Sequence, residues 1–249
     1  MNKSRKIDQC IYCGSKEKLS KEHIVPYGLN GEWTLLKASC KNCARITSDF
    51  ERHALRDIFL SARSSFGLRS RKKSLPNKFA VRVAKNGKES DLVLTTKEHG
   101  AIICLLEFKL PGYLENRKYE KGISVISSCL LRANGKDLKE LGKEKGFDTL
   151  IITNKFQGHN FEKLVAKIAY CFSVFQFGIN AFENIYVLPA ILGEKDDIGM
   201  WLGSTTPVIG NVDLESNLEI NKNNEVVARI RLFGKLSVPT YIVVVGKLK

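Results

Sequence analysis

Two cysteine pairs near the N-terminus have the residue types and the spacing of a metal site. Cys10 and Cys13 form the first pair and Cys40 and Cys43 the second, each with two residues between its cysteines. Four thiolates are the usual ligand set of a structural tetrahedral zinc site, because Zn²⁺ favours sulfur and imposes little geometry of its own. Four sulfur ligands leave the ion no open position, so we expect this Zn²⁺ to be structural and not catalytic.

An acid and a histidine, Glu22 and His23, lie between the two cysteine pairs. An imidazole with an ordinary pKa of about 6.5 is suited to act as a general base at neutral pH. A carboxylate is the kind of oxygen ligand that Mg²⁺ prefers. Because adjacent side chains of a regular strand point to opposite faces, both groups can reach one phosphate only at a strand end or a bend. A surface Glu-His pair without a role is the alternative interpretation.

Three segments together resemble the zinc-stabilised HNH endonucleases of the ββα-metal fold. They are Cys-Ile-Tyr-Cys-Gly, Ser-Lys-Glu-His-Ile-Val-Pro and Ala-Ser-Cys-Lys-Asn-Cys-Ala, within residues 10–52, and longer stretches resemble an uncharacterised branch of HNH proteins. The resemblance implies that His23 deprotonates the attacking water. It also implies that Glu22 helps to hold a single divalent ion, Mg²⁺ or Mn²⁺, on the scissile phosphate.

One position departs from that family. Many HNH proteins have His or Asn directly after the last cysteine as a second ligand on the helix, and this chain has Ala44 there. On a helix that begins near Cys43, Glu51 falls on roughly the same face as Ala44, about two turns further on. Glu51 is therefore our candidate for the replacement ligand of the divalent ion. An ordinary surface carboxylate is the alternative.

Four arginines follow the last cysteine at helical spacing: Arg45, Arg52, Arg56 and Arg63. On a continuous helix with about 100° per residue they lie within a stripe about 40° wide. Because guanidinium presents a planar fork of donors to phosphate, the stripe predicts contacts with a nucleic-acid backbone. Linker residues Arg69, Arg71, Lys72 and Lys73 either extend that contact or only keep the linker soluble. A solvated helix face with local acidic partners is the alternative.

The charge of the chain is basic and uneven. The net charge is +14 at pH 7, and residues 1–75 carry +9 of it. This imbalance indicates a polyanionic partner for the first third, most simply DNA, with RNA as the second choice. A charged surface that only promotes solubility is the alternative interpretation.

The remaining cysteines and the first residues bear on the compartment. The chain has seven cysteines, an odd number, and its polar start has no apolar signal region. Cys104, Cys129 and Cys171 stand among apolar residues and are predicted to be small buried side chains. We therefore expect a reducing, cytoplasmic environment, where paired cysteines bind metal. No stretch approaches the roughly 20 apolar residues of a membrane span, so no membrane partner is expected.

The pattern of elements predicts an α+β protein in two parts. Residues 1–66 form the small ββα-metal unit with its basic helix, 67–78 form a linker, and 79–249 form a larger α+β domain with a mostly antiparallel sheet. Strands are expected at 79–84, 91–95, 101–108, 149–153, 226–233 and 241–245, and helices at 136–145 and at 161–179. Asn86-Gly87 signals a hairpin turn, in a loop expected to exceed two residues, and Asn160 is the expected helix cap.

A second kind of nuclease site is a weaker interpretation. Asp91 and the group Glu107-Phe108-Lys109 imitate the acid and ExK element of restriction-type nucleases, in which two carboxylates bind metal. Such spacings arise often by chance.

These patterns predict a metal-dependent endonuclease that hydrolyses DNA phosphodiester bonds, with His23 as the general base. The resemblance loosely suggests restriction or phage defence. A zinc-stapled nucleic-acid-binding module that has lost catalysis is the alternative. No motif in residues 79–249 indicates a reaction, and their role is left open as binding of a protein partner or an effector.

Overall fold

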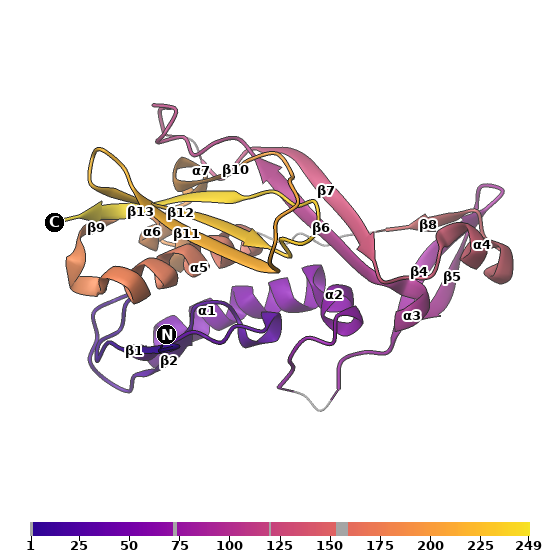
Figure 1. Cartoon of the computed structure of the whole chain (residues 1–249), viewed down its shortest axis with the longest axis horizontal. Helices are drawn as coiled ribbons and strands as arrows, with labels where there is room; N and C mark the ends of the chain where they lie inside the picture. Colours follow the sequence, from indigo (N-terminus) through magenta and orange to yellow (C-terminus); the bar gives the residue numbers. More distant parts are fainter. Residues whose placement is uncertain (1, 72–73, 120, 153–158) are drawn as a thin grey trace.

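The computed structural model describes residues 2–71, 74–119, 121–152 and 159–249. The chain has an α+β architecture whose sheets are mostly antiparallel, as the sequence predicts. It is elongated: a large body at one end is joined by a two-stranded ribbon to a small arm at the other (Figure 1). The linker lysines Lys72 and Lys73 lie outside the described residues.

The N-terminal unit is a three-stranded sheet with a helix against it. Its strands are β1 (Ser4–Lys6), β2 (Ser20–His23) and β3 (Thr34–Ser39), in the order β1-β3-β2, and its helix is α1 (Lys41–His53). Strand β3 pairs with β2 in antiparallel and with β1 in parallel orientation. Strands β2 and β3 with α1 thus make a ββα arrangement.

A tight loop with the 3-10 turn η1 (Tyr27–Leu29) follows β2. A Cβ atom on Gly31 would lie 1.8 Å from the carbonyl oxygen of Val25, so only glycine allows the chain to return this closely toward β3.

The basic helix is not continuous. After α1 the chain forms a π-helical turn, η2 (Ala54–Ile58), and then the short helix α2 (Leu60–Ser65). A π-helical turn has more residues per turn than an α-helix, so side chains beyond it leave the stripe expected from 100° steps. The assumption of one regular helix from Arg45 to Arg63 is therefore wrong.

The body is built on one antiparallel sheet and a central helix. The sheet has the order β10 (Leu202–Ser204), β13 (Tyr241–Leu248), β12 (Glu225–Leu232), β11 (Leu214–Ile220), and β9 (Phe182–Ile185) also pairs with β13. Helix α5 (Asn160–Phe177) lies between this sheet and α1 (Figure 1). The turn η3 (Ile179–Ala181) and the helices α6 (Leu188–Leu192) and α7 (Ile198–Trp201) complete the body.

Helix α5 is buried nearly all round, as its apolar composition predicts, because it has the sheet on one side and α1 on the other. Its first helical residue is Asn160, and the cap position belongs to His159, which makes no side-chain cap hydrogen bond. The expectation that Asn160 caps the helix is therefore wrong by one residue.

The hydrophobic core does not follow the predicted boundary between the first unit and the second domain. One cluster of buried side chains includes Cys10 and Leu35 of the first unit together with Leu164 of α5. The rings of Tyr12 and Tyr170 lie 5.9 Å apart, centroid to centroid. The metal-binding unit therefore shares its core with the body.

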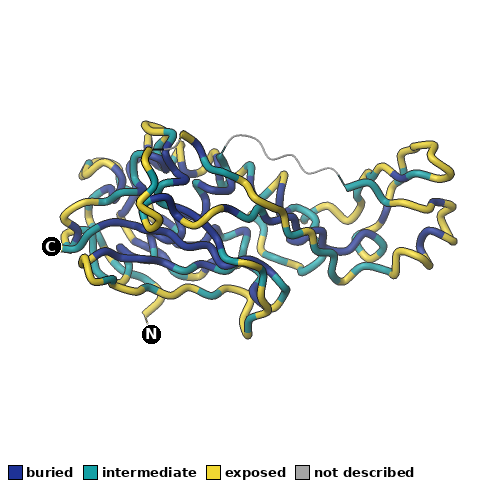
Figure 2. Tube along the Cα trace, turned by 90° about the horizontal axis from the view of Figure 1, so that it is seen from above, coloured by how far each residue is buried: buried dark blue, intermediate teal, exposed yellow. Residues whose placement is uncertain are grey.

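The arm has a separate core, whereas one strand of the ribbon contributes Ala101, Ile103, Leu105 and Phe108 to the main core. Strands β6 (Ala101–Phe108) and β7 (Val125–Ala133) form the ribbon. The arm contains the sheet β5-β4-β8 (Lys88–Thr95, Lys78–Lys85, Thr149–Ile151), α3 (Thr96–His99) and α4 (Leu138–Lys145). Its own small core consists of Val83, Leu94, Leu141 and Phe147. Figure 2 shows how exposed most of the arm is.

The hairpin of the arm corrects one expectation. Lys85 pairs with Lys88, so the loop has only the two residues Asn86 and Gly87, with φ of 49° and 76°. Positive φ at both central residues is the signature of a type I′ turn, which Asn-Gly favours. Thr153, the last residue of the strand expected at 149–153, lies outside the described residues.

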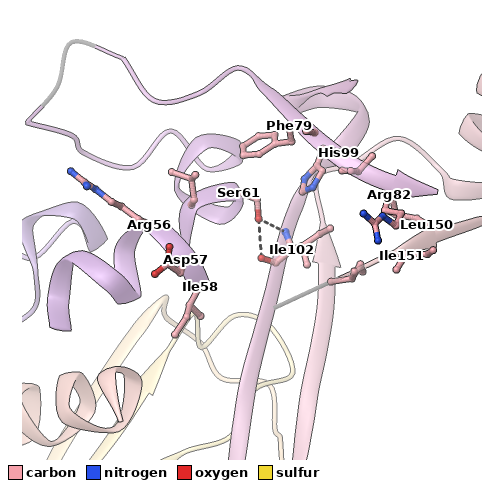
Figure 3. Close-up of a pocket in the computed structure, with 14 residues that line it drawn as sticks. Arg56, Asp57, Ile58, Ser61, Phe79, Arg82, His99, Ile102, Leu150 and Ile151 are labelled. Carbon is pink, nitrogen blue, oxygen red and sulfur yellow. Dashed lines mark hydrogen bonds between the residues drawn. The ribbon is translucent and has the colours of Figure 1, made fainter. Parts of the chain in front are cut away.

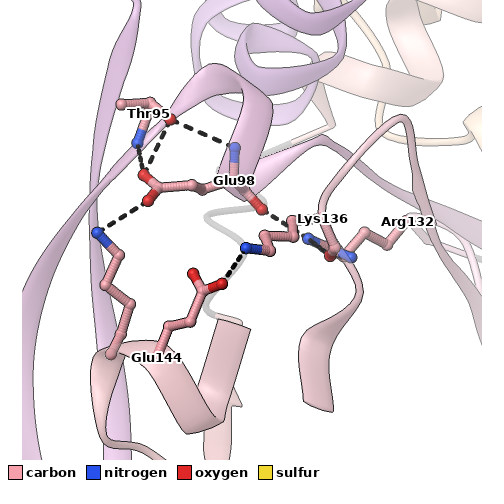
Figure 4. A network of polar contacts seen from close by, with 6 residues as sticks. Thr95, Glu98, Arg132, Lys136 and Glu144 are labelled. Carbon is pink, nitrogen blue, oxygen red and sulfur yellow. Dashed lines mark hydrogen bonds and ion pairs between the residues drawn. The ribbon is translucent and has the colours of Figure 1, made fainter. Parts of the chain in front are cut away.

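Polar contacts join α3 and α4 to each other and to the end of β5 within the arm (Figure 4). The Thr95 hydroxyl accepts from the backbone of Glu98, and the Glu98 carboxylate accepts from the backbone of Thr95, which completes a capping box. Lys145 of α4 lies 2.8 Å from the same carboxylate. The Lys145 side chain, followed by the Thr95 backbone and hydroxyl, lowers the pKa of Glu98 to about 2.

The second nuclease interpretation finds its residues in different sheets. Asp91 lies on β5 in the arm, whereas Glu107 lies on β6 of the ribbon, opposite Ser127.

Cys104 and Cys171 are buried as expected, and Cys129 is partly exposed. Among the described residues, no helix combines the length and the apolar character needed to cross a membrane.

Candidate functional site

The four cysteines of the two pairs converge. Cys10 and Cys13 lie in the turn after β1, Cys40 directly follows β3, and Cys43 lies in the first turn of α1. Their sulfur atoms all lie within 4.8 Å of one another, and those of Cys13 and Cys40 are 3.6 Å apart. Tetrahedral zinc with bonds of about 2.3 Å would separate its sulfur ligands by about 3.8 Å. The cluster could therefore hold a structural metal such as zinc.

The local backbone favours thiolate at one of these ligands. A backbone hydrogen bond from Cys43, at the start of α1, lowers the pKa of the Cys40 thiol to about 7 against the opposing effect of burial. Thiolate is the form that binds metal.

Glu22 and His23 are the last two residues of β2. His23 is the last residue of the strand and pairs with Thr34, and Glu22 pairs with Leu35. The two side chains leave the strand on opposite faces. Glu22 is 7% exposed and points into the protein, whereas His23 is only half-buried.

A lysine from the body reaches both acidic candidates. Nζ of Lys167, on α5, lies 2.7 Å from Oε1 of Glu22 and 2.8 Å from Oε1 of Glu51. It also donates to the carbonyl oxygen of His23 and lies 3.4 Å from that of Ile24. Lys167 is completely buried, and the structure thus brings Glu22 and Glu51 together around its ammonium group.

The charges of this cluster follow from burial and from the unequal number of acids and bases. Burial by itself would lower the pKa of Lys167, but the carboxylates of Glu22 and Glu51 outweigh it and raise that pKa above its ordinary value. Burial raises the pKa of Glu22, although Lys167 opposes the shift, because two carboxylates share one ammonium group. The charges of the two carboxylates therefore favour the ammonium form of Lys167.

The His23 imidazole is kept neutral by its surroundings. Burial lowers its pKa, and the positive charges of Lys21, Lys167 and Arg71 lower it further, against the weaker opposite effect of Glu51. A neutral imidazole at neutral pH can accept a proton.

A groove of about 610 Å³ lies beside this cluster. Its lining includes Tyr27, Glu51, Arg52, Arg56, Arg63 and Arg71. His23 adjoins it through Tyr27, since the two rings are 6.1 Å apart, centroid to centroid. Glu51 is one fifth exposed and so connects the buried cluster to the groove.

The four arginines of the predicted stripe have different environments. Arg45 and Arg56 are exposed, and Arg52 forms an ion pair with Asp49. Arg63 is 7% exposed and donates to the carbonyl oxygens of Gly28, Leu55 and Arg69, at 2.9, 3.1 and 3.1 Å. Its guanidinium group therefore stabilises the fold, and the prediction that it contacts a phosphate is wrong.

A second cavity of about 220 Å³ lies between α2 and the arm and also includes Arg56 in its lining (Figure 3). The Ser61 hydroxyl fixes this junction, donating to the carbonyl oxygen of Ile102 at 3.0 Å and accepting from its amide at 3.1 Å. Phe79 stacks on His99 at 4.6 Å. Arg56 therefore lines both the groove and the cavity beside the arm.

Sequence reasoning missed Lys167, and it placed Arg71 in the linker without connecting it to His23. Lys167 is one of few charged residues in the apolar helix α5, and this contrast was the available signal. Its partners come from β2 and α1, far away in the sequence, so spacing could not identify them.

The residues do not fit a divalent ion held jointly by Glu22 and Glu51. The ammonium group of Lys167 already lies within 2.8 Å of one oxygen of each carboxylate, where such an ion would have to sit.

A scan against protein-family models, a search of curated proteins and a search of solved structures each find no match to the chain.

Proposed function

We propose that the chain is a zinc-stabilised endonuclease of the HNH type that hydrolyses phosphodiester bonds in DNA. The observation that carries this proposal is the half-buried His23 at the end of β2, beside a groove lined by arginines. In this proposal Zn²⁺ is the metal of the four-cysteine cluster and holds the turn after β1, the end of β3 and the start of α1 together. The basic net charge of residues 1–75 supports a polyanionic substrate.

His23 acts as the general base in this mechanism. Its neutral imidazole accepts one proton from a water molecule, whose oxygen forms a new bond to phosphorus while the bond from phosphorus to the leaving sugar oxygen breaks. The leaving oxygen takes a proton from solvent, and the imidazolium returns its proton to solvent. Water is therefore the only co-reactant consumed.

Arginines of the groove would balance the charge on the reacting phosphate. Arg56 and Arg71 are exposed groove residues, and the charge of Arg71 already acts on His23. Fixed donors aimed at developing negative charge stabilise such a transition state. The mechanism includes no step through Mg²⁺ or Mn²⁺, because Lys167 occupies the carboxylate of Glu22 expected to bind that ion.

A binding module without catalysis is the second candidate, and one observation favours it. Glu22 is buried and paired with Lys167, so the acid expected beside the catalytic histidine does not face the groove. Such a module would use the same groove to bind DNA with a strong dependence on salt.

Nicking of supercoiled plasmid separates the two candidates. Purified wild-type protein is assayed with Mg²⁺, with Mn²⁺ and with EDTA, beside His23→Ala and the matched control His53→Ala, whose ring contacts Asp57 outside the cluster. We expect His23→Ala to lose activity by at least about 100-fold while it keeps zinc and DNA binding. Wild-type nicking by pure His23→Ala would contradict the role of His23. DNA binding without nicking under all three conditions would favour the binding module.

A further inference from the structure

The ammonium group of Lys167 has the surroundings of a bound cation. Four oxygen atoms lie around Nζ: one carboxylate oxygen each from Glu22 and Glu51, and the carbonyl oxygens of His23 and Ile24. The side chain is completely buried. An oxygen cage of carboxylates and carbonyls is the ligand environment that proteins offer to hard cations.

We propose that Lys167 is the resident cation of this site and takes the place of the divalent ion that the resemblance to HNH nucleases implies. The statement has two parts. The first, independent of activity, is that the Glu22–Glu51 pair binds no divalent ion while Lys167 is present. The second, which rests on the proposed function, is that hydrolysis at His23 needs no divalent ion.

Electrostatics and space support the first part. A divalent ion between the two carboxylates would lie within contact distance of the buried ammonium group, and two cations in a poorly solvated interior repel strongly. While the two carboxylates face only the ammonium group, their charges raise its pKa and favour the cation. It also cannot turn into solvent, because no part of the side chain is exposed.

Lys167 would act on the reaction as a positioning residue. It does not reach the groove, since it is completely buried, but it donates to the carbonyl of His23 and so fixes the end of β2 that carries the imidazole. Its contact with Glu51 ties α1, and with it the groove, to the same point. One ammonium group from the body thus joins the two elements of the site.

Binding of Mn²⁺ to zinc-loaded protein tests the first part without any assay of activity. Electron paramagnetic resonance of free Mn²⁺ counts the bound ions, and Mn²⁺ prefers oxygen ligands over the cysteine cluster. We expect wild type and Glu22→Gln to bind Mn²⁺ equally poorly. We expect Lys167→Ala, with its two freed carboxylates, to gain one Mn²⁺ per chain that Lys167→Ala/Glu22→Gln lacks. Lys163→Ala, on the same helix, is the matched control and should behave as wild type.

The outcomes that overturn the first part are specific. One is a wild-type Mn²⁺ site that disappears in Glu22→Gln. The other is a folded, zinc-containing Lys167→Ala that gains no Mn²⁺. If Lys167→Ala fails to fold, the comparison of wild type with Glu22→Gln still shows whether the Glu22–Glu51 pair binds Mn²⁺ while Lys167 is present.

The nicking assay tests the second part. We expect the same wild-type rate in EDTA as in Mg²⁺, within about twofold, after zinc content has been shown to be unchanged. In EDTA, Lys167→Ala should lose activity by about 100-fold, the scale of a displaced general base, and Mg²⁺ should restore part of it. Nicking by wild type that requires Mg²⁺ would overturn metal independence. A wild type that never nicks would refute the proposed function, and the Mn²⁺ experiment would still decide whether Lys167 is the resident cation.

Discussion

Trp33 packs against Phe175 with ring centroids 4.9 Å apart, which joins the loop before β3 to the end of α5. The ring of Phe172 lies 5.8 Å from the same indole. Arg5 adds hydrogen bonds from the first strand to the carbonyl oxygens of Phe175 and Gln176, at 2.5 and 3.0 Å. The metal-binding unit is therefore held on α5 by aromatic and polar contacts, and its stability depends on the body.

Replacing Trp33 with alanine should weaken this junction. The indole is partly buried, so we expect a loss of about 2 kcal/mol in the free energy of unfolding, below the cost of a fully buried aromatic residue. Urea denaturation followed by circular dichroism measures the loss, and zinc release should occur at lower urea. Tyr119→Ala, at a ring that is 67% exposed, is the control. Equal stability of Trp33→Ala and the control would show that the junction contributes little.

Removing one cysteine ligand should destabilise the first unit more than Trp33→Ala does. Cys40→Ser replaces a ligand at the point where β3 leads into α1, and structural zinc sites supply much of the folding free energy of small units. We expect loss of bound zinc, measured by elemental analysis, and loss of helix and strand signal from the first unit. Cys129→Ser, outside the cluster, should keep its zinc. Full zinc content in folded Cys40→Ser would contradict the four-cysteine site.

Local patterns allowed the parts of the site that are close in sequence to be predicted. The cysteine pairs and the pair Glu22-His23 were found because a few residues of spacing determine their geometry. The hairpin in the arm was found from Asn86-Gly87, whose positive φ values the turn requires. Its loop length was wrong because the register between β4 and β5 depends on pairing along whole strands.

Contacts between distant parts of the chain could not be predicted. Lys167 meets Glu22 only because α5 packs between the sheet of the body and α1. The arginine stripe failed beyond Arg52 because a π-helical turn, which no residue in the segment announces, interrupts the helix at Ala54–Ile58. The core shared by the first unit and α5 could not be predicted either, because it depends on tertiary packing between distant segments.

The groove arginines should separate into binding and structural residues. Arg56 is exposed in the groove, so Arg56→Ala should weaken DNA binding and reduce the slope of log K against log salt by about 0.9, one phosphate contact. The free energy of unfolding should stay within about 0.5 kcal/mol of wild type. Fluorescence anisotropy over a range of salt measures the slope. Arg229→Ala, on β12 and paired with Glu219, is the control outside the groove.

Arg63→Ala should show the reverse behaviour. Three carbonyl oxygens lose a donor, and we expect about 2 kcal/mol of destabilisation, measured by urea denaturation. For folded protein, the slope of log K for DNA binding against log salt should not change, because the guanidinium group is directed at carbonyl oxygens of the protein. A reduced slope with unchanged stability would instead assign Arg63 to the phosphate.

The pH dependence of nicking should follow His23. Burial and nearby positive charges lower the pKa of the imidazole, so the rate should fall only when the pH drops below the ordinary value of about 6.5 and the base becomes protonated. Lys21→Ala removes the second-largest cause of this shift, so it should move the acid limb of the profile toward higher pH and leave the plateau rate unchanged. Lys16→Ala, exposed between the cysteine pairs, should leave the profile unchanged. An acid limb above pH 6.5 in wild type, or one that does not move in Lys21→Ala, would mean that another group is the base, because the charges of Lys21, Lys167 and Arg71 all oppose protonation of the imidazole.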